Sequence, residues 1–176
     1  MQGIKFDACI SSPLVRSRQT AEIILRESGN TDVPVQFDDR IKEIDFGRYE
    51  GRKLLGGEMP DSEAEKFFKD PFSFSGFPDG ENLYQVCERT QDFLKELYAR
   101  DDGKTYLVVT HGCALRGMLN ELYQNQDDYW HGHVPYNCVV NLVEAHDGKA
   151  ELIIDDKIFY DMSKAVDQYS ESIVPT

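Results

Sequence analysis

Residues 107–117, with the sequence LVVTHGCALRG, decide the fold of this chain. The strand-forming residues Tyr106–Val109 run into a polar turn, and apolar residues at helical spacing begin at Ala114. A buried apolar strand that leads directly into a helix is typical of the parallel sheets of α/β proteins. Ligands of such sheets bind beyond the carboxyl ends of the strands, where helix N-termini favour anions. His111 therefore lies at a candidate ligand site, and this stretch equally allows a histidine that only caps its helix.

The rest of the chain alternates strands with helices. Apolar spacing predicts helices at residues 14–28, 61–69 and 81–100, and strands at residues 4–10, 33–37, 138–144 and 150–155. The pair Asp147-Gly148 predicts a hairpin turn between the last two strands. Residues 71–80 are irregular and rich in aromatic residues, which suggests a flap. The alternation predicts one α/β domain over residues 1–176, with a mainly parallel sheet and an antiparallel edge.

Composition excludes several classes of partner. The chain has 176 residues, 40% of them hydrophobic, and a formal net charge of −13 with a pI near 4.6. This charge repels nucleic acids and anionic membranes, although a local basic site could still bind a small anion. No apolar run is long enough to span a bilayer, and the N-terminus does not resemble a signal peptide. Four cysteines without a C-x-x-C pair favour a reducing compartment, so we expect a cytoplasmic protein.

Three loops follow carboxyl ends of predicted strands and should meet at one edge of the sheet: residues 11–18, 43–52 and 110–116. They carry Arg16, Arg18, Glu43, Arg48 and His111. Arginine binds phosphate or carboxylate bidentately, and a carboxyl group beside it can act as a general acid. The alternative is that these arginines pair with neighbouring acidic side chains at the surface.

A metal site is the competing hypothesis for the polar loop that follows. His131 and His133 lie close to Asp127 and Asp128, a set that could bind zinc. Their spacing fixes no third ligand, so we expect no metal and no cofactor. The sequence also contains no phosphate-loop, dinucleotide-binding or serine-elbow motif.

Five segments follow one another along the chain: SSPLVRSRQTAEII (11–24), EIDFGRYEGR (43–52), FPDGENLYQVCERTQDFL (77–94), VVTHGCALRGML (108–119) and VPYNCVVNLVE (134–144). In this order they resemble the histidine phosphatase superfamily, the phosphoglycerate mutase-like proteins. The resemblance implies a three-layer fold and two-step phosphoryl transfer through a phosphohistidine, with no metal.

Roles for individual residues follow from the same resemblance. Arg16 would hold the phosphoryl group, and Glu43 would donate a proton to the leaving oxygen. His111 would be the family's second histidine, which hydrogen-bonds the phosphoryl oxygens. Ser11 and Gly112 would complete the phosphate-binding site, with Gly112 allowing close backbone approach.

The sequence departs from the family in one respect. The family's nucleophilic histidine lies in an Arg-His-Gly motif after the first strand, and no such motif occurs here. Residues 1–12 resemble the second strand, so the first strand of the fold is missing. Because its loss would leave backbone groups of two strands unpaired, we expect a truncated product, starting at an internal Met1, that repairs its sheet or forms a homodimer through the exposed edge.

The resemblance favours a phosphatase that acts on a small phosphorylated metabolite, impaired here because the nucleophile is absent. A phosphoglycerate mutase is the less favoured enzyme, since residues 51–80 contain no long insertion. A non-catalytic module that binds inorganic phosphate or a phosphorylated metabolite on the same fold is the alternative outside the enzymes. A zinc protein using His131 and His133 is a third.

Overall fold

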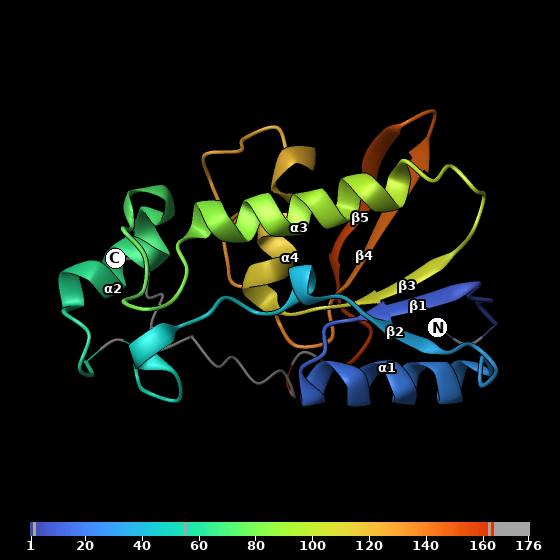
Figure 1. The fold of residues 1–176 in the computed structure, drawn as a ribbon, viewed down its shortest axis with the longest axis horizontal. Coiled ribbons are helices and arrows are strands. Elements are labelled where there is room, and N and C mark those ends of the chain that lie inside the picture. The colour runs from blue at the N-terminus through green and yellow to red at the C-terminus, as the bar shows by residue number, and fades with distance from the viewer. Residues whose placement is uncertain (2, 55, 162, 164–176) are drawn as a thin grey trace.

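Three short parallel strands form the centre of the molecule (Figure 1). In this computed structural model, which describes residues 1, 3–54, 56–161 and 163, the strands are β1 (Ala8–Ser11), β2 (Val35–Phe37) and β3 (Tyr106–Val109). Their order is β2-β1-β3, so β1 pairs on both sides. The three strands therefore end together at one edge of the sheet, as the sequence predicts.

Helices cover both faces of this sheet (Figure 1). On one face, Cys9 and Leu107 pack against α1 (Val15–Ser28). On the other, Ile10 and Val108 pack against α3 (Leu83–Tyr98) and α4 (Gly112–Leu119). The faces alternate because successive side chains of a strand point in opposite directions. The predicted three-layer α/β arrangement with a mainly parallel sheet is confirmed.

The antiparallel part of the fold is a separate hairpin, β4 (Val140–His146) and β5 (Lys149–Lys157). Asp147 and Gly148 form its turn with positive φ angles of 51° and 72°, as the sequence predicts for this dipeptide. Within the described residues, no ladder of backbone hydrogen bonds joins the hairpin to β3. The sheet is thus in two pieces, because the hairpin is attached through side chains such as Val143 and Leu152 and not through backbone pairing.

A second part of the fold lies beyond the sheet, contains α2 (Asp61–Lys69) and has its own hydrophobic cluster (Figure 1). Phe67 packs edge-on against Phe74 and Trp130, and the Trp130 indole donates to the Phe67 carbonyl at 2.8 Å. Phe74 and Phe77 are only 3% and 4% exposed. In the suggested flap at residues 71–80, Phe74 and Phe77 are therefore packed into an aromatic cluster, which buries their rings.

Most predicted boundaries shift by a few residues. β3 and α2 have the predicted bounds, whereas β1 begins later than residue 4 and β2 later than residue 33. The long helix starts at Leu83 because Asn82 and Gln85 form a capping box. The sequence also suggests a surface tail at residues 166–176, and these residues lie outside the described part of the chain. Within the part of the chain that the structure describes, no helix is both long and apolar enough to cross a membrane.

Candidate active site

Arg16 and His111 meet where β1 and β3 end. Arg16 belongs to the first turn of α1, and His111 is the N-cap residue of α4. The Arg16 Nε donates to His111 Nδ1 at 3.1 Å. A guanidinium has no acceptor, so Nδ1 carries no proton and the ring proton is on Nε2. Nε2 lies 2.8 Å from Ser12 Oγ and 3.2 Å from Ser17 Oγ, which accept that proton.

The surroundings of His111 keep its ring neutral. The residue is 9% exposed, and burial together with the charges of Arg16 and Arg89 lowers its pKa from 6.5 to about 4. A neutral imidazole is what the hydrogen bond from Arg16 requires. Both ring nitrogens are used within the protein, so His111 orients Arg16 in this arrangement and does not point a free donor outward.

Arg16 keeps an open side. The residue is exposed, and among the described residues no side chain or carbonyl accepts a hydrogen bond from its two terminal nitrogens. The bond from Nε to His111 fixes the plane of the guanidinium. The terminal nitrogens of a fixed guanidinium match two oxygens of a phosphoryl group or a carboxylate.

Glu43 occupies the N-terminus of α4. Its carboxyl oxygens accept from the backbone N–H groups of Ala114 at 3.0 Å, Ile44 at 3.0 Å and Cys113 at 3.4 Å. These bonds satisfy amides that a helix start leaves without partners. The expectation of an anion-binding helix N-terminus is modified accordingly, because a side chain of the protein already fills that position.

Burial determines the titration of Glu43. Desolvation raises the pKa of this carboxyl above its ordinary value, against the opposing effects of its backbone hydrogen bonds and the charge of Arg16. A carboxyl group with a raised pKa stays protonated to higher pH. Glu43 is therefore suited to donate a proton in the range where ordinary carboxylates are ionised.

The other two arginines of the predicted cluster, Arg18 and Arg48, pair with acidic side chains at the surface. Arg18 lies 3.6 Å from Glu22, and Arg48 lies 2.5 Å from Asp79. Both pairs are exposed at the surface. For these two residues the alternative of local surface pairing is the one that the structure shows.

Two small residues of the predicted phosphate site differ in their use. Ser11 is fully buried, and its hydroxyl donates to the Ser12 carbonyl at 2.9 Å. A Cβ atom on Gly112 would lie 3.8 Å from Val134, an ordinary van der Waals distance. Neighbouring protein atoms therefore do not demand glycine at position 112.

Sequence reasoning missed three contributors: Ser12, Ser17 and Arg89. The two serine hydroxyls bind His111, and Arg89 contacts the loop that carries Glu43. The serines lie in a predicted loop, where spacing alone does not distinguish them from other polar residues. Arg89 lies in a quoted motif, but the contacts of its side chain are not visible in the sequence.

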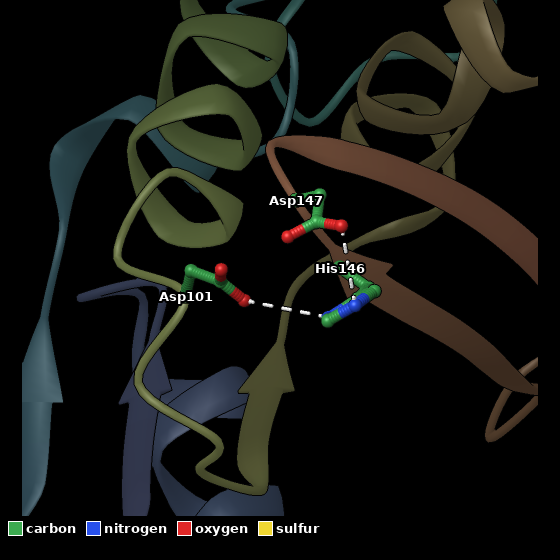
Figure 2. Close-up of side chains that lie close together, drawn as sticks. All are labelled: Asp101, His146 and Asp147. Carbon is green, nitrogen blue, oxygen red and sulfur yellow. Dashed lines mark ion pairs between the residues drawn. The ribbon is translucent and has the colours of Figure 1, made fainter.

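The histidines of the polar loop do not converge on a metal site. The ring of His131 stacks on Tyr123 with centroids 3.5 Å apart, and His133 Nε2 lies 3.4 Å from Asp156. Figure 2 shows the one group with metal-ligand spacing that the described residues contain: Asp101, His146 and Asp147. All three are exposed, and the two carboxylates approach opposite nitrogens of the His146 ring, at 3.9 Å and 3.3 Å. This is the geometry of an ion pair, so we assign no metal to it.

Residues 1–154 match the family model of the histidine phosphatase superfamily (branch 1). The chain is 31% identical over 126 residues to a 2,3-bisphosphoglycerate-dependent phosphoglycerate mutase of Methylobacterium sp. strain 4-46, covering 67% of this chain and 58% of the mutase. It is 27% identical over 142 residues to an uncharacterized phosphatase, PhoE, of Bacillus subtilis, covering 81% of this chain and 66% of that protein. The chain thus spans less than two thirds of the length of either relative.

Solved structures have the same fold. YhfR of Bacillus stearothermophilus superimposes with a TM-score of 0.77 at 24% identity, over 89% of this chain and 77% of that one. A phosphoglycerate mutase of Bacillus anthracis gives a TM-score of 0.65 at 20% identity, over 85% of this chain and 72% of the mutase. The fold is therefore phosphoglycerate mutase-like, and the resemblance seen in the sequence is confirmed. By its family match over residues 1–154, this chain belongs to the histidine phosphatase superfamily (branch 1).

Proposed function

We propose that Arg16, Glu43 and His111 form the phosphoryl-binding and proton-donating part of a phosphatase site for a small phosphorylated metabolite. The observation that carries this proposal is the Arg16 guanidinium, oriented by the 3.1 Å bond to His111 while its terminal nitrogens have no acceptor among the described residues. In so acidic a chain, an oriented cation with an open face is suited to a small anion and not to a polyanion.

The proposed chemistry assigns one task to each group. Arg16 binds two phosphoryl oxygens, and Glu43 gives its proton to the ester oxygen as the bond from phosphorus to that oxygen breaks. His111 fixes Arg16, and it can bind the phosphoryl group directly only after a ring nitrogen is released by Arg16 or by the serines. In the family-type reaction a nucleophilic histidine takes the phosphoryl group and water then removes it.

This chain does not provide the nucleophilic histidine that the first step of that reaction needs. The other three histidines lie elsewhere: His131 on Tyr123, His133 beside Asp156 and His146 at the hairpin turn. Cys113 is buried, and burial raises the pKa of its thiol well above the ordinary value, so it is a poor nucleophile. We therefore propose that turnover by this chain is severely impaired.

The same distribution of histidines favours the second candidate, a phosphate-binding module without catalysis. A mutase stays the less favoured enzyme, even though one relative is named as a phosphoglycerate mutase, because residues 51–80 contain no long insertion. We also propose a cytoplasmic location, since all four cysteines are free and three are buried, as suits a reducing compartment.

An inorganic phosphate titration, followed by calorimetry, tests the site. The wild-type chain should bind phosphate, and Arg16→Ala should weaken binding at least about tenfold, as expected for the loss of a charge-assisted bidentate contact. Arg18→Ala is the matched control, because it removes a neighbouring arginine that pairs with Glu22. Equal binding by Arg16→Ala and wild type would reject the site.

Hydrolysis of p-nitrophenyl phosphate separates the two candidates. Weak turnover by this chain supports an impaired phosphatase. Phosphate binding with no turnover supports the non-catalytic module. Full activity in this chain that is abolished by His111→Ala would show that His111 itself is the nucleophile.

The divided sheet supports a proposal about association. β3 pairs only with β1, and β4 and β5 pair only with each other, which leaves one side of β3, β4 and β5 without a backbone partner within the described residues. Unpaired edges promote pairing with another chain. We propose a homodimer through this edge, and light scattering on a size-exclusion column tests it. A strictly monomeric chain across a concentration series would contradict the proposal.

A further inference from the structure

We propose that Arg89 is a positioning residue that holds the loop at residues 40–45, so that the Glu43 carboxyl stays at the N-terminus of α4. The inference deepens the proposed function, because Glu43 is the proposed proton donor. It stands on contacts that the family resemblance did not supply: a guanidinium from α3 bound to three carbonyls of one loop.

The Arg89 side chain binds the loop through its backbone. One terminal nitrogen donates to the carbonyls of Arg40 at 2.7 Å and Lys42 at 2.8 Å, and the other donates to the Glu43 carbonyl at 3.2 Å. The side chain is 19% exposed, so these bonds lie largely out of water. A planar guanidinium has enough donors, in a fixed arrangement, to bind three carbonyls of one loop and the Glu81 carboxylate together.

Glu81 holds the guanidinium and the far end of the same loop. Its carboxylate accepts from Arg89 Nε at 2.7 Å and from a terminal nitrogen at 2.9 Å. It also accepts from the Asp45 backbone N–H at 2.9 Å, and the Glu81 N–H donates to the Asp45 carbonyl at 2.9 Å. Residues 40–45 are therefore bound on both sides of Glu43 by one ion pair.

Close backbone contact just beyond the loop strengthens this attachment. A Cβ atom on Gly80 would lie 2.3 Å from the Asp45 carbonyl oxygen, and one on Gly47 would lie 2.1 Å from the Pro78 carbonyl oxygen. Neither position has room for a side chain. The loop thus rests directly on the segment that leads into Glu81 and α3.

The placement of Glu43 is what makes its carboxyl unusual. Burial raises its pKa, while the charge of Arg16 and three backbone N–H groups oppose that rise. The other titratable groups that interact with it electrostatically are Cys113 of α4 and Tyr129 of the following loop, whose own pKa values are raised by burial. A loop released from Arg89 would expose Glu43 to water, and its pKa would return towards the ordinary value.

Carbon-13 NMR of the Glu43 side-chain carboxyl tests the proposal, with the signal assigned by its absence in Glu43→Gln. Arg89→Gln should lower the titration midpoint of Glu43 by about one pH unit or more, because the carboxyl becomes hydrated. Arg89→Lys should do nearly the same, since lysine keeps the charge but not the planar set of donors. An unchanged midpoint in both folded variants would overturn the proposal.

Arg40→Gln is the matched control. Arg40 belongs to the same loop and pairs with Asp38, Asp92 and Glu96 at its outer side. Its loss should lower stability without moving the Glu43 midpoint, so an equal shift in this variant would also overturn a specific role for Arg89. The readout needs no ligand. A wild-type chain that fails to bind phosphate would reject the proposed function and leave this test intact.

Discussion

The parallel sheet and the β4–β5 hairpin are attached to the molecule in different ways. Strand β1 lies between two strands, and Cys9, Ile10 and Ser11 are at most 5% exposed. No residue of β4 or β5 is buried, and Leu142 and Ile153 are 41% and 46% exposed. The sheet is stabilised by apolar burial under helices on both faces, whereas the hairpin has little core of its own.

A buried arginine attaches the hairpin to the rest of the molecule in place of an apolar core. Arg116 of α4 is 1% exposed and donates to Asp156 of β5 at 2.6 Å, to the His133 carbonyl at 3.0 Å and to the Tyr123 hydroxyl at 3.0 Å. The candidate site lies at the end of the packed sheet and shares none of these bonds. We therefore expect the candidate site and the β4–β5 hairpin to unfold independently of each other.

Removing Arg116 should have the largest effect. Arg116→Met leaves the Asp156 carboxylate, 12% exposed, without its cation, and breaking a buried pair in this way costs about 3–5 kcal/mol of unfolding free energy. Urea denaturation measures the loss, and amide exchange should rise first in β4 and β5. Arg26→Met, at an exposed pair, is the control and should stay within about 0.5 kcal/mol of wild type. Matching losses in the two variants would remove the proposed anchor.

A leucine pair compares the two regions directly. Leu107 of β3 is 6% exposed and Leu142 of β4 is 41% exposed. Leu107→Ala should lower the unfolding free energy by about 2–5 kcal/mol, because it opens a cavity between the sheet and α1. Leu142→Ala should cost less than about 1 kcal/mol, since this residue is already 41% exposed to water. Similar losses would show that the hairpin carries a hidden apolar core.

Acid should lower the unfolding free energy of the chain through protonation of His111 in the candidate site. The folded pKa is lowered from 6.5 to about 4, so the contribution is complete above the unfolded pKa and is lost as pH falls from 6.5 towards 4. Its upper bound is about 3 kcal/mol. Chemical denaturation at several pH values, wild type against His111→Asn, measures it. The difference isolates His111 from Glu43, whose raised pKa acts in the opposite direction.

The smallest effect is expected at the hairpin turn. Gly148 has a φ of 72°, and an alanine there costs roughly 1 kcal/mol because L-residues disfavour the left-handed region. Lys149→Ala, at the next position, should be near neutral. The loss should appear as faster amide exchange in β4 and β5 and leave phosphate binding unchanged. A change in phosphate affinity would connect the two regions that the comparison separates.

Local pattern predicted the elements well. The bounds of β3 and α2, the Asp147-Gly148 turn and the meeting of Arg16, Glu43 and His111 all follow from rules that act within a few residues or at strand ends. The placement predicted for Arg18 is wrong, because its side chain pairs with Glu22, one turn further along the same helix.

The long-range contacts could not be predicted from the sequence. Arg89 binds carbonyls 46 to 49 residues earlier in the chain, and helical periodicity says nothing about where such a side chain ends. The gap between β3 and the hairpin was missed for a similar reason, because strand patterns indicate that a strand exists but not which strand it pairs with.

The assembly of the site from distant segments has a consequence for folding. The hydrogen bond from His111 to Ser12 spans 99 residues, and the bond from Ala114 to Glu43 spans 71. Contacts of such high sequence separation form late, since the intervening loops must close first. A chain that has formed its helices but not its sheet has no site. The fraction of molecules able to bind phosphate would then equal the fraction of chains in which the parallel sheet has formed.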